Sequence, residues 1–530
     1  MQFDLNHYPY SSQRRVILGK RCAIATSQHL ATLAGIEIFN KGGNAVDAAV
    51  ASAITLTVVE PTSNGIGGDA FALVWDGKIH GINGSGKSPQ NLSLDHFAGF
   101  DEMPLRGWLA VTVPGAVALW RSLWEKWGKL PFEELFISAI RHATEGFPVS
   151  PLTAEAWERP RSLYLPLKGK EYQPFKDIFF PKGRAPKTGE IWGSQEHAET
   201  LKEIATTGGE SFYRGKLAEA IANFAAETGG IITLDDLNAH QTLWVEPIST
   251  TYRNLEVWEI PPNTQGIAAL MALNILEEFD MKNCAYESGE RLHRQIEAMK
   301  LAFADVYHHI GDLAHMSVTC EQLLNKTYAK QRQQLIQDTA TSLFNAGLPT
   351  GGTVYLCTAD QDLMVSLIQS NYEGFGGGIL VPDTGIALHN RGAGFTLQAN
   401  HPNQVAPSKR PFHTIIPGFL TQDQQAIGPF GVMGAPMQPQ GHLQVVSNLV
   451  DYHFNPQATL DAPRWRFLRE NKVLLERGVP PEIVQDLVNR GHQISMSPHT
   501  MFGKGQIIIK QNGVLVAASE SRADGLALGY

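Results

Sequence analysis

Hydrophobic positions near the start of the chain follow two helical patterns separated by a short polar break. Residues 27–59 carry apolar side chains at helical spacing, interrupted only by Lys41-Gly42-Gly43-Asn44. Gly42-Gly43 suits the left-handed turn that ends a helix, and Asn44 suits the cap of the next one. The second helix is rich in Ala and Val, so we expect it to be buried on all sides.

Strand patterns occur in both halves of the chain. Residues 70–75 and 78–82 favour two strands, and Asp76-Gly77 between them favours a tight hairpin turn. Helical patterns dominate 132–225 and 266–335. After residue 353 the pattern changes to short strands and glycine turns, with one helix expected near 437–453. The mixture predicts an α/β (α+β) fold.

The joint between these two parts carries the candidate chemistry. Residues 336–352 are polar and weakly patterned, which is typical of an exposed linker, and they end in Gly351-Gly352. Thr353 then opens a run with strand character, and a second run follows at 363–370. A hydroxyl residue at the head of a buried strand, after a flexible joint, is what a self-cleaving N-terminal nucleophile needs. On this segment alone, a simple turn before a strand is the favoured explanation, because Gly-Gly commonly precedes a strand.

Cleavage between Gly352 and Thr353 would give Thr353 a free α-amino group beside its own hydroxyl. Such an amine has a reference pKa of about 7.7–8.0, against about 10.4 for lysine. Roughly a tenth of it is neutral at pH 7, and burial lowers its pKa further. One residue would then supply both the nucleophile and the general base.

Composition and charge exclude several other classes. The chain has 530 residues, of which 43% are hydrophobic and 18% charged, with a net charge of −9, so it suits a large, well-buried globular protein. No basic cluster points to nucleic acid or to an anionic membrane. The four cysteines, Cys22, Cys284, Cys320 and Cys357, form no CxxC pair, so neither a zinc site nor a disulfide framework is indicated. Residues 1–15 lack an apolar signal segment, and no apolar run is long enough to cross a membrane, so we expect a cytoplasmic protein.

A phosphate-binding motif is matched letter for letter at Gly81-Ile82-Asn83-Gly84-Ser85-Gly86-Lys87-Ser88. A true P-loop requires a helix to begin at its Gly-Lys pair. Pro89 disfavours the helical conformation at Ser88, and the residues that follow have no clean apolar stripe. A P-loop nucleotide-binding protein is therefore the alternative of another class, and we expect the match to be accidental.

Three other segments allow two interpretations each. His293 to Glu297 has no second histidine at metal-ligand spacing, and we interpret it as helix surface. His389 to Phe395 combines an aromatic ring, polar groups and glycines, so it either lines a pocket or leaves a strand. Gly434 to His442 precedes an apolar helix; its backbone N–H groups are suited to an oxyanion hole, or it is only a turn.

Motifs in a fixed order carry a resemblance across nearly the whole chain. They are Lys41-Gly42-Gly43-Asn44-Ala45-Val46-Asp47-Ala48-Ala49, Glu60-Pro61 through Gly67-Gly68-Asp69, Val113-Pro114-Gly115, the Thr353 segment, Arg410-Pro411-Phe412-His413-Thr414-Ile415-Ile416-Pro417 and Asp461-Ala462-Pro463-Arg464. In this order they resemble the γ-glutamyltranspeptidase family of N-terminal-nucleophile hydrolases. The resemblance implies a four-layer αββα sandwich. It also implies a precursor that cuts itself into a large subunit, 1–352, and a small subunit, 353–530, within one intertwined domain.

The resemblance also implies roles for individual residues. Thr353 would be the nucleophile, with Gly352–Thr353 as the cleavage site, and Ser370 would support it from the second strand. Backbone N–H groups near Met437 and Gln438 would hold the oxyanion. The substrate-binding positions are taken by Asn371, Tyr372, Lys87, Arg391, His413 and Thr414, the last two standing where γ-glutamyl enzymes carry two serines.

Departures from the family pattern concern the acyl group. Family members that act on γ-glutamyl substrates bind the α-carboxylate with an arginine and the α-amine with an acidic residue. Here the first position is Ser85, with only Lys87 nearby, and the second is Gly394. Losing a contact to a charged group costs about 1.5–3 kcal/mol, so ordinary glutathione turnover is disfavoured. Arg391 stands where a neutral or acidic residue is usual, and its guanidinium is suited to a carboxylate.

These departures predict an amidohydrolase for an acyl group that bears a carboxylate but no α-amine, such as oxamate-type or glutaryl amides. A true γ-glutamyltransferase or glutathione hydrolase with relocated head-group contacts remains the alternative. We expect a small-molecule amide as substrate, release of the acyl group to water or an amine, and no cofactor or metal. We expect no nucleic-acid or membrane partner, and a dimer of the cleaved heterodimers is left open.

Overall fold

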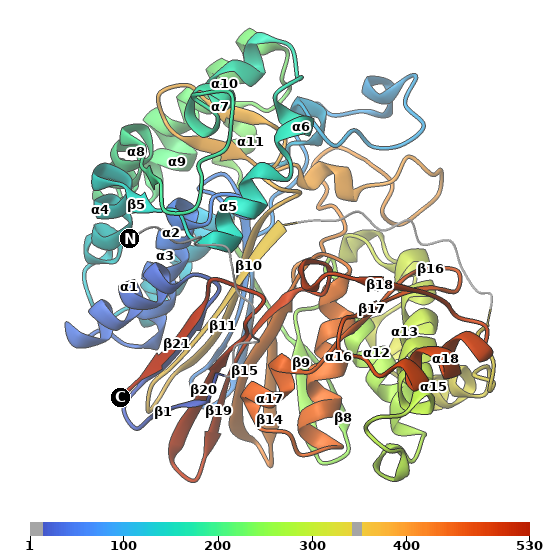
Figure 1. The fold of residues 1–530 in the computed structure, drawn as a ribbon. Helices are drawn as coiled ribbons and strands as arrows, with labels where there is room; N and C mark the ends of the chain where they lie inside the picture. Colours follow the sequence, from blue (N-terminus) through green and yellow to red (C-terminus); the bar gives the residue numbers. More distant parts are fainter. Residues whose placement is uncertain (1–13, 342–351) are drawn as a thin grey trace.

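Two antiparallel sheets lie face to face at the centre of the molecule, and helices cover the outer face of each (Figure 1). The structure, a computed structural model, describes residues 14–341 and 352–530. The four layers confirm the predicted αββα sandwich. Residues 1–13 and 342–351 lie outside the described part, so the interpretation of the chain start and of most of the linker stays a prediction.

The first sheet has the strand order β21-β2-β10-β11-β3-β4-β7, with the strand of Thr353 near its middle. Its strands are β2 (Ala23–Thr26), β3 (Asp69–Trp75), β4 (Ile79–Asn83), β7 (Leu243–Val245), β10 (Gly352–Ala359), β11 (Met364–Tyr372) and β21 (Leu526–Gly529). The second sheet has the order β1-β20-β19-β15-β14-β9-β8. Its strands are β1 (Ile17–Gly19), β8 (Ile248–Tyr252), β9 (Leu255–Glu259), β14 (Gly418–Gln422), β15 (Gln425–Met433), β19 (Lys504–Gln511) and β20 (Val514–Ser519).

Helices from residues 29–238 cover the first sheet. They are α1 (His29–Asn40), α2 (Ala45–Val59), α3 (Ala116–Trp127), α4 (Ile137–Glu145), α5 (Pro151–Glu158), α6 (Arg161–Tyr164), α7 (Gln173–Phe179), α8 (Gln195–Thr206), α9 (Glu210–Arg214), α10 (Lys216–Thr228) and α11 (Leu234–Asn238). The second sheet is covered by α12 (Gly266–Glu277), α13 (Gly289–His309), α14 (Cys320–Leu323), α15 (Lys326–Gln333), α16 (Met437–Val450), α17 (Pro456–Asp461) and α18 (Pro481–Asn489).

Short strands complete the structure outside the two main sheets. They form the pairs β5 (Phe147–Pro148) with β6 (Ile191–Trp192) and β12 (Ile379–Val381) with β13 (Ile386–Leu388), and the three-stranded set β16 (Trp465–Arg469), β17 (Lys472–Glu476) and β18 (Gln493–Ser497). Among the described residues, no helix combines the length and the apolar character that crossing a membrane requires.

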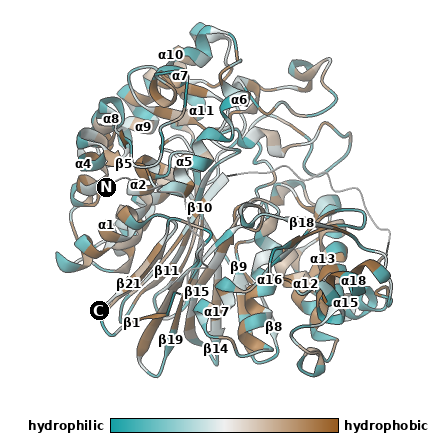
Figure 2. Cartoon of the chain, viewed as in Figure 1, coloured by the Kyte–Doolittle hydropathy of each residue, from teal (hydrophilic) through white to brown (hydrophobic). Residues whose placement is uncertain are grey.

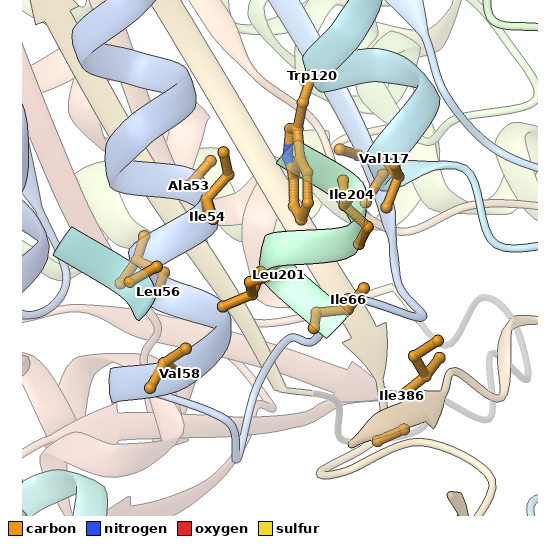
Figure 3. Close-up of a cluster of buried hydrophobic side chains, with 14 of the residues drawn as sticks. Ala53, Ile54, Leu56, Val58, Ile66, Val117, Trp120, Leu201, Ile204 and Ile386 are labelled. Atoms are coloured by element: carbon orange, nitrogen blue, oxygen red, sulfur yellow. The ribbon is translucent and has the colours of Figure 1, made fainter. Parts of the chain in front are cut away.

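Three apolar layers hold the sandwich together, and hydrophobic residues accordingly concentrate along the sheets and the inner helix faces (Figure 2). The middle layer lies between the sheets and includes Phe71, Tyr355 and Ile508. In the layer outside the first sheet, side chains of α2, α3 and α8 meet around Trp120 (Figure 3). All residues of α2 are buried, which confirms its predicted burial on every side.

Local sequence signals place α2 against the strand that begins at Thr353. Gly42 adopts a positive φ of 87° after α1, and Asn44 caps α2 by accepting from the N–H groups of Val46 and Asp47. The first turn of α2 is then tied to β10, because the Thr358 hydroxyl donates to the Ala45 carbonyl at 2.7 Å. These contacts confirm the predicted helix break. The predicted hairpin at Asp76-Gly77 is also confirmed, by the pairing of β3 with β4.

Replacing Asn44 with Ala should destabilise the protein, because it removes the acceptor of both cap hydrogen bonds and the donor to the Trp127 carbonyl. Loss of such a cap lowers the free energy of unfolding by about 1–2 kcal/mol. Calorimetric melting should therefore show a lower midpoint for Asn44→Ala, and Asn44→Ser, which keeps a hydroxyl acceptor, should recover most of it. Equal midpoints for the wild type and Asn44→Ala would show that the cap does not stabilise this junction.

Candidate active site

Thr353 lies at the start of β10, between β2 and β11 in the first sheet, and only 1% of its surface is exposed. The pairing of β10 with β11 shifts here, because Gly352 lies opposite Tyr372 while Val354 lies opposite Gln369. Ser370 and Asn371 therefore share the space opposite a single residue, as in a β-bulge. Tyr372 has a φ of 74°, a left-handed conformation that is strained for a bulky side chain.

The Ser370 hydroxyl is the centre of the hydrogen bonds around Thr353. Its Oγ donates to the Gly352 carbonyl oxygen at 2.7 Å and accepts from the Thr353 hydroxyl at 3.3 Å. It also accepts from the Tyr372 backbone N–H at 2.7 Å and from Arg391 Nη2 at 3.3 Å. Three donors thus direct the Ser370 hydrogen toward the carbonyl of the Gly352–Thr353 peptide bond.

Arg391 is a fully buried cation next to this centre. It begins a short 3₁₀ turn, Arg391–Gly394, and its Nη1 donates to the Thr414 hydroxyl at 2.8 Å. Its guanidinium carbon lies 4.2 Å from the centre of the Tyr372 ring. Within the described ranges its Nε has no hydrogen-bond partner and no carboxylate lies at ion-pair distance. Burial lowers the pKa of Arg391 to about 10, which leaves it charged at neutral pH. A buried cation in this state is suited to an incoming anion.

Asp69 supplies a buried carboxylate on the neighbouring strand, directly opposite Ser370 in the β3–β11 pairing. Its Oδ1 accepts from the Gly115 N–H at 3.1 Å, and its Oδ2 lies 3.0 Å from Nε2 of His413. Nε2 of His389 is 3.5 Å from Oδ1. Burial raises the pKa of Asp69 to about 7, and the charge of Arg391 opposes this rise.

The two histidines beside Asp69 are neutral. Nδ1 of His389 accepts from the Arg391 N–H at 3.0 Å, so Nε2 carries the ring hydrogen and faces Asp69. Burial lowers the pKa of His389 to about 3 and that of His413 well below its usual value. Nε2 of His413 is engaged with Asp69, and the ring packs edge-on against Phe71. The predicted role of His413 in substrate binding stays a prediction.

The loop predicted to hold the oxyanion begins α16. The Met437 N–H donates to the Gly434 carbonyl at 3.1 Å and the Gln438 N–H to the Ala435 carbonyl at 3.0 Å, so both amides are engaged in the turn. The Gln438 side chain accepts from the Ile416 N–H at 2.9 Å, which joins this loop to the segment of His413 and Thr414. An oxyanion would have to compete with the Gly434 and Ala435 carbonyls for these two N–H groups.

Asn371 and Lys87, two other predicted substrate-binding residues, lie in different settings. Asn371 is buried; its N–H donates to the Ser63 carbonyl, and its Oδ1 has no partner in the described part of the chain. Lys87 is exposed at the rim of a pocket that Arg410 and His240 also line. No helix begins at Lys87; the next element is a 3₁₀ turn at Leu94–Phe97. The nucleotide-binding alternative therefore lacks the helix that it requires.

His293 is a correction, because the structure buries it instead of leaving it on a helix surface. Its Nδ1 lies 2.9 Å from Nε2 of His492, and Glu297 is close enough to complete a three-residue cluster of metal-ligand type. These groups already have protein partners: His293 Nε2 contacts the Gln337 carbonyl, and Lys300 pairs with Glu297 at 2.7 Å. The cluster links α13 to Gln337, which precedes Thr353 in the sequence, and to His492, which follows it.

Asp69 and His389 are the site residues that received no role from the sequence. Asp69 ends the glycine loop Gly65 to Gly68 and opens a strand that is otherwise apolar. A carboxylate at the head of a buried strand is the signal that would have found it, since buried acids need partners or a function. His389 lies in the segment for which a pocket and a strand exit were both open. It follows directly on β13 (Ile386–Leu388), which agrees with the strand exit, and the pocket stays a prediction.

Comparison with known proteins agrees with this geometry. The γ-glutamyltranspeptidase family profile matches residues 31–530. The glutathione hydrolase-like YwrD proenzyme of Bacillus subtilis (strain 168) is 35% identical, over 97% of this chain and 99% of its own length. The oxamate amidohydrolase proenzyme of Klebsiella pneumoniae is 34% identical, over 95% and 97%. The solved structure of a cephalosporin acylase from Bacillus halodurans superposes with a TM-score of 0.96, at 49% identity, over 100% of this chain and 99% of that one.

These relatives span the same length and include enzymes named as amidohydrolases, hydrolases and acylases, several of them as proenzymes. The arrangement of two sheets and outer helices is shared with the acylase structure along the whole chain. The chain therefore belongs to the γ-glutamyltranspeptidase family and is an amidohydrolase of the N-terminal-nucleophile type.

Proposed function

We propose that the chain cleaves itself before Thr353 and then hydrolyses amides through a Thr353 acyl-enzyme, with preference for acyl groups that carry a carboxylate and no α-amine. The observation that carries the first part is the Ser370 hydroxyl, which contacts both the Thr353 hydroxyl and the Gly352 carbonyl. The buried Arg391, whose Nε has no partner and whose guanidinium has no carboxylate at ion-pair distance among the described residues, carries the second part.

Self-cleavage needs a nucleophile and a polarised carbonyl at one place. Thr353 Oγ attacks the Gly352 carbonyl carbon, and the C–N bond breaks as the Thr353 nitrogen takes the proton, which leaves an ester on the threonine oxygen. Water then cleaves the ester and releases Gly352 as a carboxylate and Thr353 with a free amine. The Ser370 hydrogen bond to the carbonyl oxygen would stabilise the negative charge that develops there during attack.

Turnover repeats the same chemistry on a substrate amide. Thr353 Oγ attacks the amide carbonyl, its own amine takes the hydroxyl proton and passes it to the leaving amine, and water releases the acyl group. The nearby Arg391 charge disfavours a protonated amine, so it helps to keep this base neutral. Arg391 and Ser370 thus act on both steps.

Both halves of the precursor would remain in one fold after cleavage. In the first sheet β2, β3, β4 and β7 come before Thr353, whereas β10, β11 and β21 come from 353–530. The second sheet also joins both segments, because β1 pairs with β20 and β9 pairs with β14. Separation of the two pieces would expose the apolar layer between the sheets, so a stable pair of large and small subunits is the expected product.

The acyl preference follows from the charges around Thr353. An α-amine would approach Arg391 as a like charge, and Gly394 offers no side chain to pair with it. A carboxylate, in contrast, would pair with the guanidinium and satisfy its free Nε. Oxamate, which the Klebsiella relative is named for, combines an amide with a carboxylate and has no α-amine.

Thr353→Ala should abolish both formation of subunits and amide hydrolysis, because the attacking oxygen is removed. Thr353→Ser keeps a hydroxyl and an N-terminal amine, so it should mature and retain measurable turnover. Denaturing gels and an amidase assay on the three proteins check this. Cleavage or turnover in a folded Thr353→Ala protein would assign the nucleophile to another residue.

Arg391→Ala should reduce kcat/KM for glutaryl and oxamate amides roughly 10- to 100-fold more than for neutral acyl amides of the same length, from the loss of a charged contact. Arg391→Lys keeps the positive charge but loses the two-pronged geometry of the guanidinium. Its kcat/KM for the carboxylate-bearing amides should therefore lie between those of the wild type and Arg391→Ala. Because both substrate classes are measured on the same variant, any effect that the substitution exerts through Ser370 cancels in the ratio of the two kcat/KM values. A ratio unchanged by Arg391→Ala, or a wild type that prefers γ-glutamyl amides, would contradict the proposed acyl group.

A further inference from the structure

The charges of the acyl site balance without touching. Arg391 and Asp69 are both fully buried, and neither forms an ion pair with the other among the described residues. Ser370 connects the two residues, because its Oγ accepts from Arg391 Nη2 at 3.3 Å and it lies directly opposite Asp69 in the β3–β11 pairing. His389 accepts through Nδ1 from the Arg391 backbone N–H, and its Nε2 lies 3.5 Å from Asp69. The carboxylate of Asp69 is thus held by neutral donors, while the guanidinium of Arg391 is free to accept an anion.

An anion at Arg391 would change the state of Asp69. The positive charge of Arg391 favours the ionised form of Asp69, and burial opposes that form. A substrate carboxylate paired with Arg391 cancels most of this support and adds a second buried negative charge. A second buried carboxylate close to Asp69 is a like charge in a region of low dielectric constant, which is costly unless a proton enters.

We propose that Asp69 takes up a proton from solvent when a carboxylate-bearing acyl group binds to Arg391, so that the site binds its anion together with a proton. The binding of a carboxylate at Arg391 comes from the proposed function. The new element is Asp69 as the group whose protonation compensates the added negative charge. The proton converts the Asp69 carboxylate to a carboxylic acid, and no bond between heavy atoms changes.

The groups that face Asp69 leave it as the acceptor within the neutral pH range. His389 and His413 resist protonation because of burial and the Arg391 charge. Tyr213 stays neutral because burial raises its pKa, and Arg410, which bonds to the Ser85 carbonyl, stays cationic. The pKa of Asp69 is raised to about 7, so its ionisation is incomplete near neutrality.

Glu373, whose pKa burial raises and which also feels the Arg391 charge, is one competing acceptor, and the α-amine of cleaved Thr353 is the other. The reference pKa of the amine, about 7.7–8.0, lies in the same range, and a nearby carboxylate would also favour its protonated form. Any test must therefore separate uptake by Asp69 from uptake by these two groups. Substitution of Asp69 does so, because it leaves both of them in place.

Linkage fixes the direction of the pH effect. When binding takes up a proton, affinity is highest at low pH and falls as pH rises through the pKa of the free site, here about 7 for Asp69. Affinity reaches a lower plateau above the pKa of the bound state. A neutral ligand that does not engage Arg391 should show no such fall.

Calorimetric titration of the mature enzyme with glutarate, in buffers of different ionisation enthalpy, counts the protons taken up. We expect uptake of a measurable fraction of a proton per site near pH 7 for the wild type, and almost none for Asp69→Asn or for the uncharged analogue glutaramide. Uptake that persists in Asp69→Asn would place the proton on another group, the Thr353 amine or Glu373, and overturn the proposal. Glutarate binding without proton uptake in the wild type would overturn the proposal and leave the proposed function standing.

Infrared difference spectra keep the test decisive if Asp69→Asn does not fold or mature. Wild-type enzyme labelled with ¹³C-aspartate should gain an isotope-shifted carboxylic acid C=O band when unlabelled glutarate binds. A spectrum without this band would overturn the proposal. If glutarate fails to bind the wild type and Arg391→Ala does not alter carboxylate preference, the proposed acyl group itself fails together with this inference.

Discussion

The Ser370 hydroxyl donates its hydrogen to the Gly352 carbonyl while three other groups donate to its oxygen. Because those three donors come from Thr353, Tyr372 and Arg391, the hydroxyl links the bond to be cut, the nucleophile and the acyl site. The bulge between β10 and β11 makes the link geometrically available, since it places two residues opposite Thr353. The strained φ of Tyr372 belongs to the same bulge, and the packing of the buried strands on both sides maintains it.

Burial sets the electrostatic behaviour of this region. The sandwich excludes water from Thr353, Arg391 and Asp69 alike, so each charge is felt strongly by its neighbours. Arg391 serves three purposes in this account: it donates to Ser370, it disfavours protonation of the future amine, and it attracts a carboxylate. Among the described residues Asp69 forms no direct ion pair with Arg391 and is held by the Gly115 N–H and by His413, which leaves the guanidinium available.

Features with local causes could be predicted from the sequence, and features that depend on distant partners could not. The Asn44 cap and the Asp76-Gly77 turn are decided by residues within a few positions of each other, and both were predicted. Burial of His293 was missed because its partner His492 lies 199 positions away. The role of Asp69 was missed for the same reason, because its contact with His413 spans 344 positions. The motif order predicted the family and the fold, but it carried no information on which side chains bond to one another.

The central claim is that the chain is a precursor whose new N-terminus is Thr353. Intact mass spectrometry of the purified wild-type protein, combined with N-terminal sequencing of its parts, tests this most directly. The account predicts two polypeptides, one with the mass of residues 353–530 and with Thr353 as its first residue. A single full-length chain that persists on incubation, or a cut at any other bond, would contradict it.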